Sequence, residues 1–188
     1  FSSPEVAQAS GLPNSTWYDA GQTVKLGPAP QYINMNPVER LALDSWNVDG
    51  ATQPGDSIDV AMDGPHHVEL IYRTQYYLEV TSDYGETTGV GWYFSGAKAN
   101  YGVTYVRSDF PVKYSLTRWR LISSNVTRTV SPNETEIIMD RPYVVEAEWN
   151  VDYTPTWILI IAIISVVIII AAITVVAVKR PDSFRNFA

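Results

Sequence analysis

The chain has 188 residues, a formal charge of −7 and no cysteine. This length allows one or two small domains, and the absence of cysteine excludes disulfides, zinc–thiolate clusters, thiol nucleophiles and covalently attached haem. The acidic charge argues against a nucleic-acid partner, because nucleic acids select clustered Lys and Arg.

The first ten residues, FSSPEVAQAS, lack the basic start and apolar run of a signal peptide. They align with the later segment LEVTSDYG, so that Val6 lies over Val80. Because few residues precede Val6, we expect the chain to begin inside a strand. Further protein upstream or a neighbouring chain would then supply the missing edge, and whether Phe1 is the native terminus stays open.

Three blocks of sequence recur in the same order. Residues 16–26 match 91–101, residues 41–50 match 114–123, and MDGPHHVELIYRTQY at 62–76 matches MDRPYVVEAEWNVDY at 139–153. The offsets are 75, 73 and 77 residues, and small loop insertions explain the differences. Because the order is kept, the blocks indicate a duplicated structural unit.

Each copy contains short, alternating, β-rich segments separated by turn residues. YYLEVTS and KYSLTRWRLI alternate, and GWYFSGAKANYGV predicts a strand pair with a turn at Ser95-Gly96. We therefore predict an all-β ectodomain of two tandem Ig-like or B-repeat-like β-sandwich units, at residues 1–76 and 77–154. The N-terminal strand of the first unit is expected to be truncated, and no amphipathic helix is expected in either unit.

A long apolar segment follows, from Trp157 to Val178, without a single charged residue. A helix of about 20 such residues crosses a hydrocarbon core of roughly 30 Å, whereas buried core helices are rarely so long and so uniformly apolar. We predict a transmembrane helix at 155–178 that contacts the lipid bilayer. Lys179, Arg180 and Arg185 follow it, so the tail at 179–188 is predicted to be cytoplasmic and the N-terminal region extracellular.

His66 and His67 are the only histidines in the chain, and they lie near Asp63. On a strand, adjacent side chains point to opposite faces, so the two histidines could not bind one metal ion together without a bulge. Tyr143 and Val144 occupy the equivalent positions of the second copy. We therefore interpret the histidines as ordinary strand residues and predict no metal site and no cofactor.

Two other patterns allow a binding interpretation. Asp63 and Asp140 recur in an MDxP motif that would suit calcium, but an aspartate before x-Pro more simply fixes a turn. Five tryptophans could form a platform for glycans, but repeated aromatics more often fill the core of a small sandwich. These are Trp17, Trp46, Trp92, Trp119 and Trp149.

No catalytic arrangement is visible, since neither G-x-S-x-G nor a pair of aspartic-protease loops is present, and we predict no enzyme and no catalytic residue. Three N-x-S/T sequons precede the apolar segment, at Asn14, Asn125 and Asn133. We predict glycosylation at these asparagines, with unmodified turn residues as the alternative.

One copy of the duplicated unit runs Y-x-L-x-V-T-S-x-Y-G, G-x-G-W-Y-x-x-G, W and I-x-M-D-x-P-x-x-V-x-A-x-W. It resembles the repeat module of archaeal surface proteins and, more distantly, the B-repeat of internalin-type bacterial surface proteins. The resemblance covers both predicted units and implies spacing, adhesion or assembly. The residues that carry it are Tyr77, Val80, Gly85, Gly91, Trp92, Tyr93, Gly96, Trp119, Met139, Asp140, Pro142, Val145, Ala147 and Trp149.

These patterns predict a single-pass cell-membrane protein that anchors or spaces a surface assembly such as an S-layer or filament. Its expected partners are the bilayer, other surface or membrane subunits and glycans. Two alternatives stay open. One is an accessory subunit that caps the outer face of a respiratory or transport complex. The other is the membrane-proximal remnant of a larger surface hydrolase or solute-binding protein.

Overall fold

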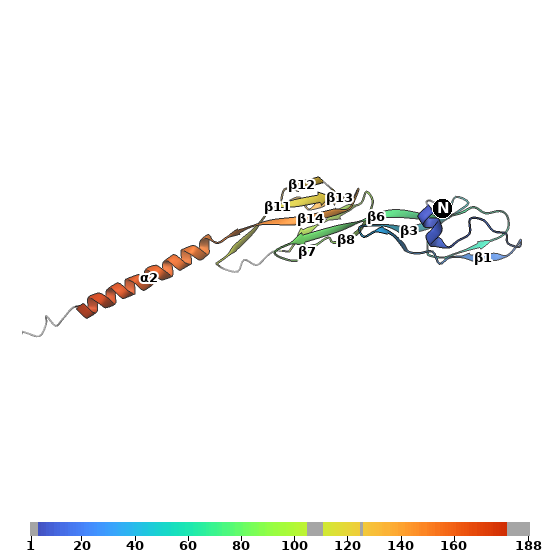
Figure 1. Ribbon diagram of the computed structural model, residues 1–188. Coiled ribbons are helices and arrows are strands. Elements are labelled where there is room, and N and C mark those ends of the chain that lie inside the picture. The colour runs from blue at the N-terminus through green and yellow to red at the C-terminus, as the bar shows by residue number, and fades with distance from the viewer. Residues whose placement is uncertain (1–3, 105–110, 125, 180–188) are drawn as a thin grey trace, which may run out of the picture.

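The computed structural model describes residues 4–104, 111–124 and 126–179. They form an elongated molecule, with β-strands at one end and a single long helix at the other (Figure 1). The helices are α1 (Pro4–Ser10) and α2 (Thr154–Lys179). The strands are β1 (Thr23–Leu26), β2 (Tyr32–Asn36), β3 (Glu39–Val48), β4 (Ala51–Gln53), β5 (Ile58–Ala61), β6 (Val68–Ser82), β7 (Thr87–Thr88), β8 (Gly91–Phe94), β9 (Lys98–Asn100), β10 (Gly102–Val103), β11 (Lys113–Ser123), β12 (Val126–Val130), β13 (Glu136–Ile138) and β14 (Tyr143–Asp152). The prediction of a β-rich chain that ends in one long apolar helix is confirmed.

The largest sheet has the order β12-β11-β14-β6-β3-β2, with β4 added to β3 and β8 added to β6. Three smaller antiparallel pairs accompany it, namely β1 with β5, β9 with β13 and β7 with β10. The 15-residue strand β6 connects the two halves of the molecule, because its first part pairs with β3 and its last part with β14. Residues 76 and 77, where the sequence pattern changes from one copy to the next, therefore lie inside one continuous strand.

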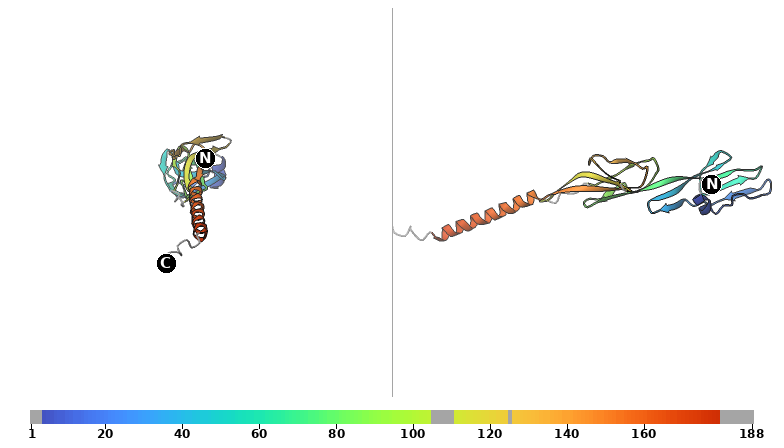
Figure 2. Two further views of the ribbon diagram at one scale, coloured as in Figure 1. Left: turned by 90° about the vertical axis from the view of Figure 1, so that its left-hand side faces the viewer. Right: turned by 45° about the horizontal axis from the view of Figure 1, so that its top comes forward.

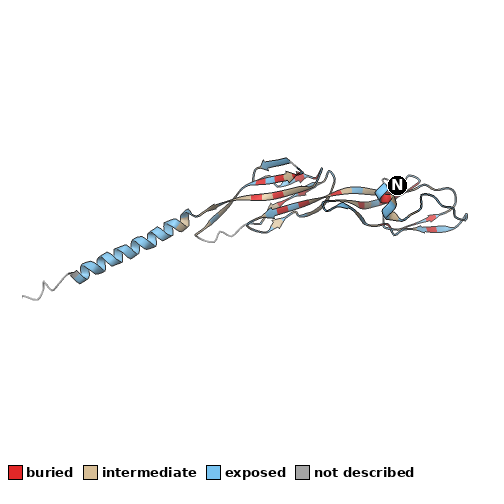
Figure 3. Cartoon of the chain, in the orientation of Figure 1, coloured by how far each residue is buried: buried red, intermediate tan, exposed pale blue. Residues whose placement is uncertain are grey.

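Two separate clusters of buried side chains form the core, as the red segments of Figure 3 indicate. The distal cluster, farther from α2, consists of Val6, Ala29, Trp46, Val48, Ile58, Val60 and Leu70. The proximal cluster consists of Leu78, Val80, Ala99, Tyr101, Trp119, Leu121, Ile137, Met139, Val145 and Ala147. The largest fully buried side chain of each cluster is a tryptophan, since Trp46 is 0% exposed and Trp119 is 1% exposed.

The strand pairings of the distal half recur in the proximal half. The pairs β1·β5, β3·β4 and β3·β6 correspond to β9·β13, β11·β12 and β11·β14. In register, Trp46 lies opposite Leu70 and Trp119 opposite Ala147, so the partners are again 77 residues apart. Each indole N–H donates to a backbone carbonyl, that of Gly55 at 3.1 Å for Trp46 and that of Pro132 at 3.3 Å for Trp119.

One pairing does not recur. In the proximal half, Tyr143–Ala147 of β14 pairs in parallel with Leu78–Ser82 of β6, on the edge that β11 leaves free. In the first copy of the repeat, the residues equivalent to this part of β14 are 66–70, which lie 77 positions earlier in the sequence. Among the residues that the structure describes, no strand pairs with residues 66–70 on the edge away from β3.

The segment that was expected to fill this position as a strand forms helix α1 instead. Pro4 suits the first turn because it needs no amide hydrogen there, and Gly11 ends the helix with a positive φ of 63°. Val6 is buried in the distal cluster, and α1 lies against β2 rather than along β6. The prediction of a strand at these residues was therefore wrong, because a proline at the start and a glycine at the end favour a short helix of about two turns.

Candidate functional site

The end of the β-strand region passes almost directly into α2. Strand β14 ends at Asp152, and only Tyr153 separates it from the first residue of the helix. The Asp152 carboxylate accepts a hydrogen bond from the Thr154 N–H at 2.9 Å, which stabilises the turn into the helix. Hydrogen bonding by the Thr154 side chain and then by its backbone lowers the pKa of Asp152. The Thr156 hydroxyl donates to the carbonyl oxygen of Pro111 at 3.1 Å, so the first turn is also attached to the β-strand region.

The surface of α2 is apolar on every side. Residues Thr154–Val178 are long and apolar enough to cross a membrane, and no residue of the most apolar 18-residue window within them is buried. At 1.5 Å per residue the 25 residues reach about 37 Å, more than the roughly 30 Å of a hydrocarbon core. Tyr153 and Trp157 are exposed at the end nearer the strands, where aromatic residues commonly lie at the membrane interface.

The two hydroxyl side chains within α2 are satisfied by the helix itself. Ser165 donates to the carbonyl oxygen of Ile161 and Thr174 to that of Ile170, each at 2.8 Å. An unsatisfied hydroxyl in lipid would favour a partner helix. Because both hydroxyls are bonded within α2, neither requires such a partner.

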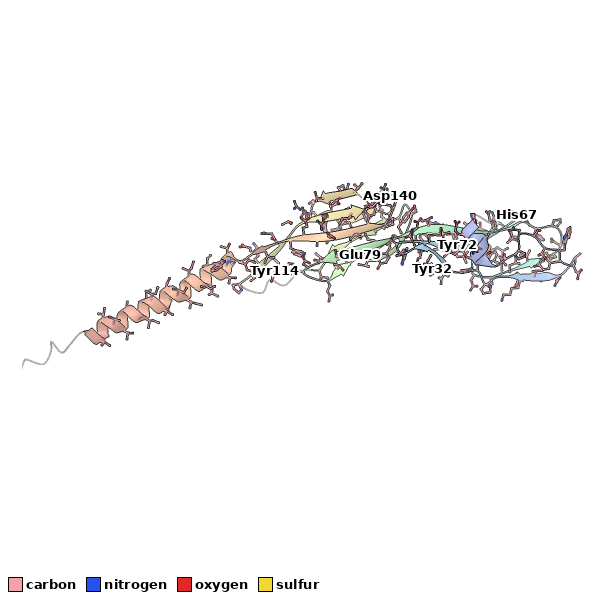
Figure 4. All side chains as sticks on the ribbon, in the orientation of Figure 1. Tyr32, His67, Tyr72, Glu79, Tyr114 and Asp140 are labelled. Carbon is pink, nitrogen blue, oxygen red and sulfur yellow. The ribbon has the colours of Figure 1, made fainter. Side chains whose placement is uncertain are left out.

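The two histidines lie at the opposite end, near the start of β6 (Figure 4). The prediction that they are strand residues was wrong, since β6 begins at Val68. His66 Nδ1 lies 2.6 Å from one carboxylate oxygen of Asp49, and the His67 backbone N–H donates to the other at 2.7 Å. His66 Nε2 lies 3.1 Å from Asp63 Oδ1, without the geometry of a hydrogen bond.

Electrostatics couple this group of side chains. The hydrogen bond that the His66 ring donates to the Asp49 carboxylate raises the pKa of His66, and the nearby charges of Asp49 and Asp63 raise it further. The hydrogen bonds from the His67 backbone and from the His66 side chain lower the pKa of Asp49. Among residues 4–104, 111–124 and 126–179, no group of three His, Asp or Glu side chains could hold a metal ion. The group therefore behaves as an ion pair that closes a loop.

The two MDxP aspartates have different surroundings. Asp140 forms an ion pair with Arg141 at 3.2 Å and accepts a hydrogen bond from the Tyr143 hydroxyl at 2.8 Å. The Arg141 hydrogen bond is the main cause of the lowered pKa of Asp140. The recurrent feature is in the backbone, because the N–H groups of Asp63 and Asp140 both donate to the carbonyl two residues earlier. This supports the turn interpretation of the motif rather than the calcium interpretation.

The five tryptophans considered as a glycan platform do not share one surface. Trp46 and Trp119 are buried in different clusters. The Trp149 indole N–H donates to the Ser82 hydroxyl at 2.8 Å. Trp92 lies where the two halves join, with its ring 5.2 Å from that of Tyr77.

At this junction the Arg40 guanidinium lies between two aromatic rings, 3.8 Å from the centroid of Tyr32 and 4.4 Å from that of Trp92. Its Nε donates to the Gln75 side chain at 2.8 Å. The contact joins β2, β3 and β8 across the boundary between the clusters. Cation–π contacts of this kind contribute roughly 0.5–1 kcal/mol each.

Trp17 is the exception, since its side chain is 98% exposed. It lines a groove of about 660 Å³ at the distal end, between the loop that contains it and the start of β6. Trp46 and Leu70 from the distal cluster form part of the groove wall, together with His66 and Val68. The sequence did not indicate this groove, although the alignment of Trp17 with Trp92 could have pointed to a tryptophan that lacks its neighbour.

Two of the three predicted glycosylation positions can be located. Asn14 is exposed in the loop that lines the groove, and Asn133 is exposed in the turn between β12 and β13. Both side chains are therefore accessible to modification. Asn125 lies outside the described residues.

No known family model, curated protein or solved structure matches this chain.

Proposed function

We propose that the chain is a structural protein of the outer cell surface, which anchors or spaces an assembly such as an S-layer or filament. In this proposal α2 crosses the cell membrane, the tail is cytoplasmic and the strands form two tandem β-sandwich repeats outside the cell. The main observation that supports this proposal is that only one residue, Tyr153, separates the end of β14 from the start of α2. Without a flexible linker, the strands extend the membrane anchor as a stiff rod.

The elongated shape supports a spacing role. In Figure 1 and in the right-hand view of Figure 2 the two halves and α2 follow one another along the molecule rather than folding back on each other. The strand β6 belongs to both halves, and the Arg40 contact stabilises their junction. A rod of this kind suits holding a partner at a fixed distance from a membrane.

The repeat interpretation is supported by the recurrence of the three strand pairs and of the tryptophan hydrogen bonds. The orientation is supported by Lys179, Arg180 and Arg185 after the apolar segment, since basic residues mark the cytoplasmic side. The exposed sequon residues Asn14 and Asn133 suit an extracellular location.

The anchoring role can be tested in the source cells by replacing the chain with a variant that lacks residues 154–188. We expect the surface assembly to separate from membranes during fractionation. A matched control replaces α2 with an unrelated 25-residue Leu/Ala span, which should retain the assembly because only anchoring is required. Retention of the assembly by the truncated variant would contradict the proposal. So would native purification of the full chain with redox or transport subunits.

A further inference from the structure

The distal groove occupies the position at which the proximal half holds an additional strand. In the proximal half, Leu78–Ser82 of β6 pairs in parallel with Tyr143–Ala147, and Leu78 and Val80 are buried in the proximal cluster. Residues 66–70 are the counterparts, 77 positions earlier in the sequence, of the β14 residues 143–147 that pair with this part of β6. His66, Val68 and Leu70 of this range line the groove.

Three differences between the halves follow from this missing strand. Tyr143 and Val144 belong to β14, whereas His66 and His67 precede β6, because a segment with one free edge has fewer partners to hold it extended. Trp92 has Tyr77 of the added strand as a ring neighbour at 5.2 Å, whereas its counterpart Trp17 is 98% exposed.

The third difference concerns the strand that carries Trp92. Residues 91–94 form β8, which pairs with residues 75–78 of β6. The aligned residues 16–19 form no strand. Among the described residues, they have no strand partner equivalent to the part of β6 that pairs with β8.

We propose that the groove binds an extended strand in parallel with residues 66–70, and that a separate polypeptide built of the same repeat contributes this strand. The strand would carry the Tyr-Leu-x-Val pattern of residues 77–80. Its Leu would lie opposite His66 and its Val opposite Val68, as Leu78 lies opposite Tyr143 and Val80 opposite Val145. Main-chain hydrogen bonds would supply affinity, and the apolar side chains would supply specificity.

The source of the strand follows from how this molecule supplies its own. The added strand of the proximal half is the continuation of β6, the last strand of the preceding half. The same edge of β6 already accepts a strand further along, because β8 pairs with Gln75–Leu78 on that side. A second copy of the chain could not donate in the same way, because its last strand, β14, passes into α2.

The chain's own α1 segment is engaged elsewhere. Val6 is 0% exposed in the distal cluster, and α1 lies against β2. Moving this segment into the groove as a strand would remove a buried side chain from the core. The groove therefore remains available to an external strand.

The test uses the full chain in lipid nanodiscs and a fluorescent peptide with the sequence of residues 75–84, QYYLEVTSDY. We expect saturable binding by fluorescence anisotropy and slower amide hydrogen exchange at residues 66–70. A peptide with Leu78→Asp and Val80→Asp should bind at least about tenfold more weakly, because it would bury two charges. In the protein, Trp17→Ala should weaken binding about fivefold, since it removes an aromatic contact.

Val126→Ala is the matched control, because Val126 is an exposed residue of the edge strand β12 in the other half. It should leave binding unchanged. Absence of binding, equal binding of the Asp-substituted peptide or protection at β12 instead of residues 66–70 would overturn the inference. Protection of residues 66–70 without peptide would show that the chain fills its own groove, and would overturn it as well.

The inference rests on the proposed anchoring role, since it names the part of the rod that would join the assembly. The two can fail separately. Loss of peptide binding with intact anchoring contradicts only the strand-binding groove, whereas an assembly retained by the truncated variant contradicts the anchoring role.

Discussion

At the scale of single residues, the Asp49–His66 pair holds the distal loop in a pH-dependent way. Because the folded-state pKa of His66 is raised above 6.5, its contribution to stability is fully present below that value and is lost as the pH rises through the folded pKa. Because the pKa of Asp49 is lowered below 3.8, its contribution is present above that value and is lost as the pH falls through the folded pKa. The pair therefore stabilises the fold most between about pH 4 and pH 6.5.

The Asp49→Asn substitution should lower the pKa of His66, because it removes the largest cause of the upward shift. Asp63→Asn should lower it less, because Asp63 contributes only a charge effect. An NMR titration of the His66 ring protons measures both changes, and His67→Gln in all samples leaves one histidine signal. An equal effect of the two substitutions would contradict the geometry of the pair.

Tyr101 illustrates a second residue-scale effect. Its hydroxyl is buried without a hydrogen-bond partner among the described residues, and burial raises the pKa of Tyr101 to about 12. Tyr101→Phe should therefore increase the free energy of unfolding by about 1 kcal/mol, because it removes an unsatisfied polar group. Urea unfolding of the full chain in micelles gives the measurement.

Tyr93 provides the matched control for Tyr101, because its hydroxyl donates to the Gly89 carbonyl at 2.9 Å. Tyr93→Phe should decrease the free energy of unfolding by about 1 kcal/mol. If both substitutions shifted stability in the same direction, the assignment of the two hydroxyls would be wrong.

At the scale of elements, much of the fold could be predicted because hydrophobic alternation follows local geometry. The turn at Ser95-Gly96 separates β8 from β9 as expected, and KYSLTRWRLI lies within β11. The apolar run predicted α2 within a residue or two of its ends, because an uninterrupted apolar segment has few alternative structures.

What could not be predicted depends on contacts between distant segments. The continuity of β6 through both halves depends on β3 and β14 pairing with successive parts of one strand. The groove and the position of His66 depend on a strand that is missing from one edge, and no local pattern reports a missing partner. The short helix α1 was missed because its capping residues outweighed the alignment with LEVTSDYG.

The junction between β14 and α2 is the element on which the rod depends. Inserting a six-residue Gly/Ser segment between Tyr153 and Thr154 should uncouple the strands from the helix, because such linkers are flexible. Spin labels at Ile138 and Ile168 should then give a broad distance distribution, in place of the narrow one expected for the unmodified chain. Equally broad distributions in both proteins would show that the junction is not stiff.

At the scale of the whole molecule, a helix apolar enough to cross a membrane, the proximal cluster and the distal cluster follow one another along the molecule (Figure 1). Each part has a distinct contribution in the proposal. The helix fixes the chain in the membrane, the shared strand β6 keeps the two halves aligned, and the groove provides a directional end for assembly. The histidines matter in this scheme because they lie where the next strand would bind.

The central claim, that α2 crosses the membrane with the strands outside, is tested most directly by cysteine labelling. The chain has no native cysteine, so Val126→Cys, Ile168→Cys and Ser183→Cys each introduce one reactive thiol. With a membrane-impermeant maleimide, we predict labelling of the Val126→Cys chain in intact cells, of the Ser183→Cys chain only after permeabilisation, and of the Ile168→Cys chain in neither case. Labelling of the Ser183→Cys chain in intact cells, or protection of the Val126→Cys chain, would contradict the account.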